Sequence, residues 1–346
     1  MAQIDELFKI MVQQGASDLH ITTGEPPYFR ISGEMARSQH KVLSNDELKA
    51  LIFEILTERQ RAKFAKEWEL DCSYSLNGYG RFRCNIFMQR RGLGAVFRAI
   101  PDKIMTIEDL KLPKSLAELC QVHKGLIVVT GATGSGKSTT LAALIDHMNK
   151  TQTKHILTVE DPIEFVHLSQ QSLINQREVE SHTKSFASAL KAALREDPDV
   201  ILVGEMRDLE TIQLAITAAE TGHLVFGTLH TNTAVRTIDR IVDVFPAGQQ
   251  KQIQTMLAES LRAVIAQNLL PRVGGGRVAA IEVLVNNTAV SNLIREGKTF
   301  QIPSAMQTGR AEGMFTMQHY VQQLLDQGLI SDSTAAPFLG RTARAA

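Results

Sequence analysis

Residues 126–138 read Leu-Ile-Val-Val-Thr-Gly-Ala-Thr-Gly-Ser-Gly-Lys-Ser. The first five predict a buried strand, and the apolar spacing after Lys137 predicts a helix. The glycine-rich turn between them matches GxxxxGK[ST], a pattern whose backbone N–H groups surround phosphate oxygens at a helix N-terminus. We therefore expect a nucleotide phosphate site, with Lys137 on the β- and γ-phosphates and Ser138 on Mg²⁺. The residues expected to bind the nucleotide are Gly131, Ala132, Thr133, Gly134, Ser135, Gly136, Lys137, Ser138 and Thr139.

Length and composition exclude several classes of protein. The chain has 346 residues, of which 37 are basic and 37 acidic. This length predicts two domains, and the balanced charge argues against a strongly basic nucleic-acid binder. The three cysteines form no CxxC pair, which excludes a four-cysteine zinc site and indicates a reducing compartment. The acidic N-terminus is unlike a signal peptide, and no run of about 18 apolar residues occurs. We expect a cytoplasmic chain that reaches a membrane only through a partner.

The pattern of elements changes near residue 100. Before it, helical spacing at residues 4–14 and an N-cap at Ser44 accompany alternating strands on both sides of a predicted Asn-Gly hairpin turn at residues 77–78. We expect a small α+β domain over residues 1–100 and a linker over residues 101–115. In residues 116–346, apolar runs alternate with helical segments, which predicts an α/β domain with a parallel sheet covered on both faces. The predicted strands are 126–130, 156–160, 200–203 and 224–228.

Two acidic segments follow predicted strands of this sheet. Glu205 follows the strand at 200–203 after Gly204, at a position where a carboxylate contacts Mg²⁺. The longer side chain of glutamate favours contact through a water. The second segment, residues 160–164, follows the strand at 156–160. Within it we favour Glu164 as the base that polarises the attacking water, with Glu160 and Asp161 as alternatives.

Histidines stand at the two ends of the strand at 224–228. His230 lies at the carboxyl end, where ligands bind in open α/β sheets, so we favour it as a contact of the γ-phosphate. His223 lies at the opposite end, and for it a packed or hydrogen-bonded role and a functional role are equally supported.

Arg81 and Arg83 alternate along one predicted strand of the first domain and therefore point to the same face. Two adjacent guanidinium groups repel unless an anion faces them, and a triphosphate bound by a neighbouring subunit would serve. Without further information, a solvated sheet face is the simpler interpretation of this pair.

Together these motifs resemble the secretion ATPase superfamily of type II secretion, type IV secretion and type IV pilus motors, over nearly the whole chain. Residues 15–21 (Gly-Ala-Ser-Asp-Leu-His-Ile) resemble its N-terminal signature, and residues 160–164, 202–205 and 221–231 resemble its Asp box, Walker B segment and His box. The resemblance implies a PAS-like N-terminal domain, a RecA-like P-loop ATPase core and a ring of six subunits that hydrolyses ATP with Mg²⁺.

The resemblance also implies roles for single residues. Glu164 is then the catalytic glutamate, Glu205 the Walker B acid and His230 a phosphate contact, while Arg81 and Arg83 reach the phosphates between the two domains. Within the superfamily, the chain is most similar to the retraction ATPases of type IV pili. Residues 289–296 (Ala-Val-Ser-Asn-Leu-Ile-Arg-Glu) resemble a segment associated with retraction and depart from it at Val290 and Ser291.

The implied partners are the inner-membrane platform protein and the rest of the pilus machinery, which places the chain in the cytoplasm at the pilus base. Assembly ATPases of the superfamily are longer and usually carry a tetracysteine motif, so this chain is expected to retract rather than to assemble. The alternatives are an assembly or secretion ATPase of the same superfamily, a DNA-translocating RecA-like motor and a non-catalytic nucleotide-gated scaffold.

Two features remain open at this stage. Gly204, Gly222 and Gly227 are either hinges or sites of tight packing. Residues 249–262 have helical spacing, for which a core helix is favoured over a contact with a neighbouring subunit.

Overall fold

The computed structural model describes residues 2–100 and 103–340. The chain divides into two compact units, and the boundary along the sequence lies between Lys103 and Ile104. Parts of the predicted linker (residues 101–102) and of the predicted second domain (residues 341–346) lie outside the described residues. The domain and linker bounds given above therefore stay predictions, and each unit is described by itself.

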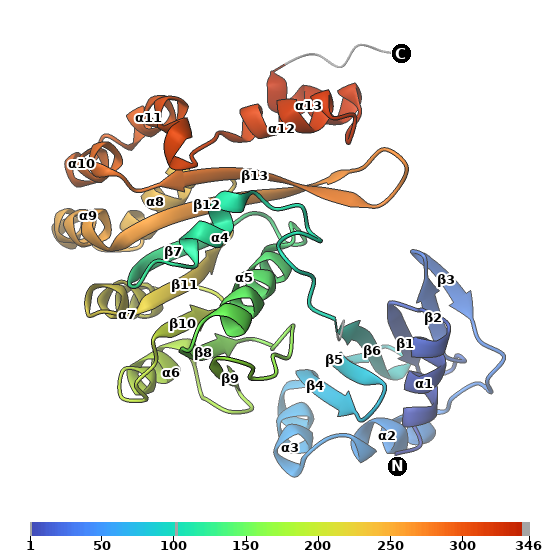
Figure 1. The fold of residues 1–346 in the computed structure, drawn as a ribbon. Helices are drawn as coiled ribbons and strands as arrows, with labels where there is room; N and C mark the ends of the chain where they lie inside the picture. Colours follow the sequence, from blue (N-terminus) through green and yellow to red (C-terminus); the bar gives the residue numbers. More distant parts are fainter. Residues whose placement is uncertain (1, 101–102, 341–346) are drawn as a thin grey trace. The chain divides into compact units, whose positions relative to one another are not determined.

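The first unit is an antiparallel sheet with three helices (Figure 1). Its strand order is β3-β2-β1-β6-β5-β4. One sheet face is apolar and packs on α1, where Phe8 stacks on Phe82 with ring centroids 4.3 Å apart. The elements are α1 (Asp5–Gln13), β1 (Asp18–Thr22), β2 (Tyr28–Ile31), β3 (Glu34–Arg37), α2 (Asn45–Glu54), α3 (Glu58–Glu67), β4 (Glu69–Leu76), β5 (Gly80–Gln89) and β6 (Gly92–Ile100).

The second unit is built on a sheet of order β13-β12-β7-β11-β10-β8-β9. Neighbouring strands are parallel except for β13, which pairs antiparallel with β12. Its strands are β7 (Gly125–Thr130), β8 (His155–Glu160), β9 (Leu173–Glu178), β10 (Val200–Val203), β11 (Leu224–Leu229), β12 (Leu261–Pro271) and β13 (Arg277–Val285). The main helices are α4 (Lys114–Leu119), α5 (Lys137–Thr151), α6 (Phe186–Ala193), α7 (Leu209–Glu220), α8 (Ala234–Asp243), α9 (Ala247–Ser260), α10 (Thr288–Glu296), α11 (Ile302–Thr308), α12 (Met317–Asp326) and α13 (Asp332–Leu339).

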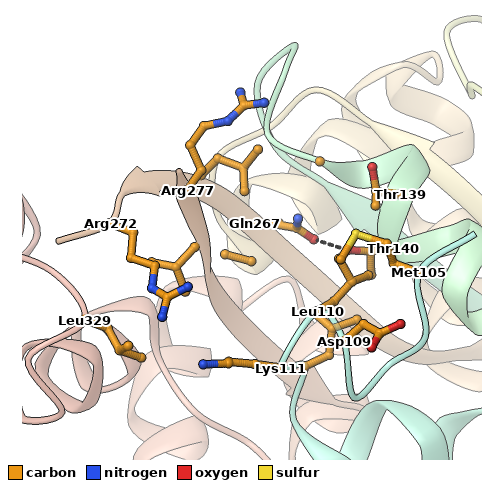
Figure 2. A pocket seen from close by; sticks show the side chains of 15 residues that line it. Met105, Asp109, Leu110, Lys111, Thr139, Thr140, Gln267, Arg272, Arg277 and Leu329 are labelled. Atoms are coloured by element: carbon orange, nitrogen blue, oxygen red, sulfur yellow. Dashed lines mark hydrogen bonds between the residues drawn. The ribbon is translucent and has the colours of Figure 1, made fainter. Parts of the chain in front are cut away.

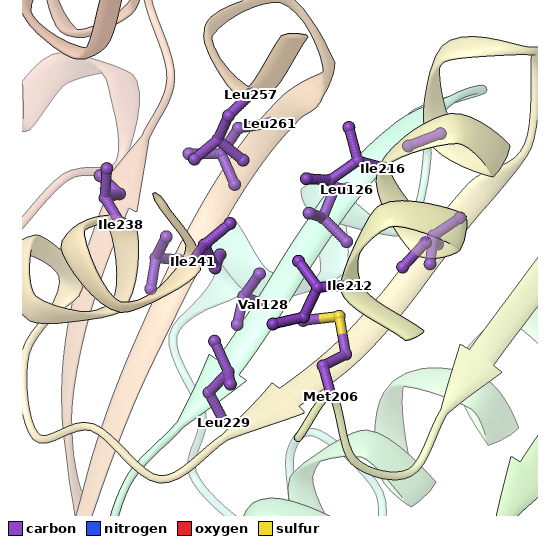
Figure 3. Packing of buried hydrophobic residues seen from close by; sticks show 14 of the residues in the cluster. Leu126, Val128, Met206, Ile212, Ile216, Leu229, Ile238, Ile241, Leu257 and Leu261 are labelled. Carbon is purple, nitrogen blue, oxygen red and sulfur yellow. The ribbon is translucent and has the colours of Figure 1, made fainter. Parts of the chain in front are cut away.

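Both faces of this sheet are buried, as predicted. Along β7, Leu126 and Val128 point to one face, and Ile127 and Val129 point to the other. Helices α6 to α9 cover the first face, and α4 and α5 cover the second. Figure 3 shows the first face, where side chains of α7, α8 and α9 converge on β7. The central strands are therefore continuous apolar runs, which is the pattern that made them recognisable in the sequence.

The structure decides two of the open features. An added Cβ on Gly227 would lie 2.6 Å from Met206 Cε, and one on Gly204 would lie 3.1 Å from the Val159 carbonyl oxygen, so both are sites of tight packing. Gly222 has open space around it and a φ of +121°, which favours glycine. The helix predicted over 249–262 is wrong at its end, because α9 ends at Ser260 and β12 begins at Leu261.

Candidate functional site

The glycine-rich loop joins the end of β7 to the first turn of α5, as predicted. Lys137 opens α5 and is 9% exposed. Its Nζ donates hydrogen bonds to the carbonyl oxygens of Gly131 at 2.7 Å and Ala132 at 3.1 Å, so the side chain folds back over the loop. The helix N-terminus and the lysine charge together make this loop an anion site.

Two carboxylates face Lys137. Burial lowers the pKa of this lysine, and the negative charges of Glu205 and Glu164 raise it in part. Lys137 opens the helix that follows β7, while Glu205 and Glu164 follow β10 and β8, two neighbouring strands that β11 separates from β7. The structure thus places the predicted lysine and both predicted acids in one electrostatic environment.

Two side chains, those of His230 and Arg207, contact Glu205. Its Oε1 lies 3.1 Å from Nε2 of His230, which follows β11. The same oxygen accepts a hydrogen bond from Nε of Arg207, and this bond raises the pKa of Arg207. The structure therefore unites the predicted Glu205 and His230, and it adds Arg207, which sequence reasoning missed although it lies two residues after Glu205.

The alternatives within residues 160–164 differ in their surroundings. Glu160 Oε1 accepts hydrogen bonds from Thr158 Oγ1 at 2.7 Å and Gln176 Nε2 at 3.2 Å, and its removal from water raises its pKa. Glu164 and Asp161 are exposed. Glu160 is bonded within the sheet, whereas the charge of Glu164 acts on the pKa of Lys137, so Glu164 stays the predicted base.

A pair of threonine side chains ties the His230 segment to the strand that precedes the phosphate loop. Thr130 Oγ1 accepts from the backbone N–H of Thr231 at 3.0 Å and donates to its carbonyl oxygen at 2.7 Å. Thr231 Oγ1 in turn lies 2.6 Å from Thr237 Oγ1 in α8. His223, at the other end of β11, places Nδ1 3.0 Å from the Ala218 carbonyl oxygen, which is the packed and hydrogen-bonded role.

A cavity of about 380 Å³ adjoins the phosphate loop (Figure 2). Gly136, Thr139 and Thr140 of the loop and α5 form one wall, and residues 109–112 form another. The apolar lining suits a flat heterocycle, and the cationic side chains suit acceptor groups at its rim. The other lining residues are Met105, Gln267, Leu269, Arg272, Arg277, Val278, Ala279 and Leu329.

The Mg²⁺ ligand set predicted from the sequence is small. Ser138 stands in the first turn of α5, and Glu205 faces the neighbouring lysine. One hydroxyl and one carboxylate acting through water fit Mg²⁺, which keeps several waters and completes its octahedron with substrate phosphates. Within residues 2–100 and 103–340, no cluster of three or more His, Cys, Asp or Glu side chains could hold a metal on its own.

In the first unit, Arg81 and Arg83 lie on β5 and share one sheet face, as their spacing predicts. Arg81 Nη2 donates to Ser73 Oγ at 2.6 Å, and the Arg83 side chain is exposed. The helices α1, α2 and α3 contribute side chains to the apolar cluster on the opposite face, which Phe82, Cys84 and Ile86 of β5 also enter.

Arg83 belongs to a lateral row of charges that sequence reasoning missed. Arg83 pairs with Arg98 on β6, Arg98 pairs with Asp18 on β1, and Asp18 pairs with Arg30 on β2. The buried carboxylate of Asp18 accepts a hydrogen bond from Arg98 Nε at 2.8 Å, and Arg30 Nε lies 3.9 Å away. Like charges directly across a sheet destabilise it, so the row is suited to an incoming anion.

None of the helices in the described part of the chain combines the length and the apolar character that crossing a membrane would require.

Comparisons with known proteins identify the family of the chain. The family model of the type II/IV secretion system protein matches residues 1–288. The type IV pilus retraction ATPase PilT of Pseudomonas aeruginosa is 53% identical over 332 residues, 96% of each chain, and the twitching motility protein of Neisseria gonorrhoeae is 52% identical, with 95% of this chain and 90% of that one covered.

A solved structure of the pilus retraction motor PilT with bound ADP superposes with a TM-score of 0.91 at 49% identity, covering 98% of this chain and 97% of that one. The predicted fold class, a RecA-like parallel-sheet ATPase core preceded by a small α+β PAS-like domain, is confirmed. Family model, relatives and superposition all agree with the predicted resemblance, and the chain belongs to the type II/IV secretion system protein family.

Proposed function

We propose that this chain is the subunit of a hexameric motor that hydrolyses ATP to power retraction of type IV pili. The observation that supports the proposal is the phosphate loop itself, with the charges of Glu205 and Glu164 acting on the pKa of Lys137 at its end. A phosphate cradle with carboxylates at the ends of neighbouring strands is the arrangement that P-loop ATP hydrolysis needs. Retraction as the mechanical output is supported by the similarity to PilT over nearly the whole chain.

Each side chain then has one task. Lys137 binds the β- and γ-phosphates, His230 contacts the γ-phosphate, and Glu164 takes the proton of the attacking water. Ser138 and, through water, Glu205 hold Mg²⁺, which when bound neutralises the charge that develops on the phosphates. His230 and Arg207 both contact Oε1 of Glu205, and these contacts restrain the carboxylate.

The nucleoside occupies the cavity beside the loop. The apolar side chains of Met105, Leu110 and Leu269 are placed to contact the base. Gly136, Thr139 and Thr140 of the loop and α5 line the same cavity, so one ligand can reach both the cavity and the loop. The cavity volume of about 380 Å³ is within the range of small-molecule sites.

Each nucleotide site of the ring is completed by arginines of a neighbouring subunit. In this arrangement Arg81 and Arg83 of one subunit face the phosphates bound by its neighbour, which adds negative charge beside a row that holds three arginines and one aspartate. We place the motor in the cytoplasm at the inner-membrane base of the pilus, where its partner is the platform protein. No nucleic-acid partner is expected, because the chain carries no excess of positive charge.

Loss of the arginine pair tests the trans arrangement. The double variant Arg81→Ala/Arg83→Ala is expected to lower steady-state ATP hydrolysis by about 100-fold or more, because arginine groups aimed at the transferred phosphate stabilise the transition state. The exposed Arg37, whose ion pair with Glu25 spans 3.8 Å, provides the control, and Arg37→Ala should keep wild-type activity.

Mixed rings separate action in trans from action within one chain. A Lys137→Ala subunit and an Arg81→Ala/Arg83→Ala subunit are each inactive alone. Mixed, they should regain activity, because an intact phosphate loop then meets intact arginines from a neighbour. A mixture that stays as inactive as its components contradicts the trans arrangement.

The function itself is tested in a piliated bacterium whose retraction ATPase has been deleted. Expression of this chain is expected to restore twitching motility and reduce the excess of surface pili, whereas the Lys137→Ala variant restores neither. The purified chain should release phosphate from ATP in parallel. An increase in piliation would indicate assembly instead, and strong DNA binding that weakens steeply with salt would indicate a DNA translocase.

A further inference from the structure

Gln267 is a buried polar residue at the point where the sheet meets the phosphate loop. It lies on β12 and is 2% exposed. The preceding residue, Ala266, pairs with Thr130 at the end of β7, so Gln267 stands beside Gly131, the first residue of the loop. A buried amide among apolar strand residues needs partners for its polar groups, and all of those found lie in the loop or in α5.

The amide makes two hydrogen bonds. Its Nε2 donates to the Ser135 carbonyl oxygen at 2.8 Å, and its Oε1 accepts from Thr140 Oγ1 at 2.8 Å (Figure 2). A carbonyl oxygen only accepts, so the nitrogen of the amide must face Ser135 and the oxygen must face Thr140. This fixed orientation bonds Gln267 to the last part of the loop and to the first turn of the helix at once.

Gln267 also requires the glycines at both ends of the loop. A Cβ on Gly131 would lie 2.3 Å from the Gln267 carbonyl oxygen, and a Cβ on Gly136 would lie 2.7 Å from Gln267 Nε2. Both distances are too short for any side chain. The loop is therefore packed against Gln267 at both of its ends, at Gly131 and at Gly136.

The same residue lines the cavity beside the loop. In the wall of this cavity Gln267 lies beside Thr140, to which it is bonded (Figure 2). It therefore connects the phosphate loop with the strand that continues toward Arg272 and the hairpin of β12 and β13.

We propose that Gln267 is a positioning residue that holds the phosphate loop in its anion-binding shape before the nucleotide arrives. This proposal rests on the proposed function. It states that nucleotide affinity depends on Gln267, a residue that lies outside the GxxxxGKS stretch. With the loop already ordered, binding does not have to supply the cost of ordering it. Without Gln267, the Ser135 carbonyl and the Thr140 hydroxyl lose their partner, and the loop must be ordered during binding.

The test is the affinity for ADP of Gln267→Leu, which replaces the amide by an apolar side chain of similar size. We expect the Kd measured by calorimetric titration to rise by about 10- to 100-fold, the effect of losing one or two buried hydrogen bonds. The KM for ATP should rise by a similar factor and kcat should fall less, because the loss is in ground-state binding. A purely structural role would lower the unfolding temperature of the nucleotide-free protein and leave the Kd of the folded fraction unchanged.

Four further variants sharpen the result. Asn268→Leu changes the neighbouring residue on the opposite sheet face and should bind ADP like the wild type. Thr140→Val removes one of the two bonds and should weaken ADP binding less than Gln267→Leu does, while Thr140→Ser keeps the hydroxyl and recovers most of the loss. In the double variant Gln267→Leu/Thr140→Val the two losses should be less than additive, because both remove the same bond.

The outcomes are distinct. An ADP affinity of Gln267→Leu within twofold of the wild type overturns the proposal. If Gln267→Leu does not fold, the pair Thr140→Val and Thr140→Ser decides, and equal affinities of these two overturn it. A wild-type chain that binds no ADP contradicts the proposed function instead.

Discussion

Replacement of Lys137 by alanine is expected to abolish ATP hydrolysis and to weaken ADP binding. This lysine is the buried cation of the loop, and its Nζ is held at the loop by the carbonyl oxygens of Gly131 and Ala132. Removing one preorganised group that stabilises the transition state costs about 100- to 1000-fold in kcat. Phosphate release and ADP titration with the purified variant measure the two effects.

The control for this variant is Lys191→Ala. Lys191 lies on α6, is largely exposed and forms an ion pair with Glu210, so its loss should change neither activity nor stability by more than a small amount. Hydrolysis by Lys137→Ala at more than about a tenth of the wild-type rate contradicts the assignment of the loop as the phosphate site.

The second large effect is expected for Glu205→Gln. The variant keeps the size of the side chain and loses its charge, so the Mg²⁺ water is no longer held, and kcat should fall by about 100- to 1000-fold. Binding of ADP should stay close to the wild type, because the loop and Lys137 are intact. Single-turnover phosphate release measures the chemical step directly.

Glu210→Gln is the matched control for Glu205→Gln. Glu210 lies five residues later, in the first turn of α7, and its side chain is 56% exposed. Near-normal phosphate release by Glu205→Gln removes Glu205 from the reaction. Glu164, which also faces Lys137, would then be the acid to examine.

Much of the fold can be predicted from the sequence because the central strands are buried on both faces. β7, β8, β10 and β11 are short apolar runs, and each was predicted to within one or two residues. β9 was missed because its side chains are mostly polar, as is usual at a sheet edge. β12 was missed because its apolar residues continue the spacing of α9, and the change from helix to strand at Leu261 leaves no local signal.

The residues of the candidate site also divide into those with a local sequence signal and those without one. Glu205, Glu164 and His230 were predicted because each follows a recognisable strand, and parallel strands bring their carboxyl ends together. Gln267 and Asp18 were not predicted as partners of site residues, because their roles depend on register. The bond from Gln267 to Ser135 spans 132 positions, and the pair of Asp18 and Arg98 spans 80. Contacts over such distances in the sequence can be recognised only in the folded structure.

The position of β7 within its sheet limits how this molecule can move. β7 is bonded to β11 on one side and to β12 on the other, so shifting it would break two ladders of backbone hydrogen bonds at once. The segment that carries His230 is joined to β7 by far fewer bonds, chiefly those between Thr130 and Thr231. Any displacement that follows a change at the phosphates should therefore leave the sheet rigid and be taken up by the segments after its strands. The sheet would then be the rigid part of the ATPase domain, and the segments after its strands would be the parts that move during hydrolysis.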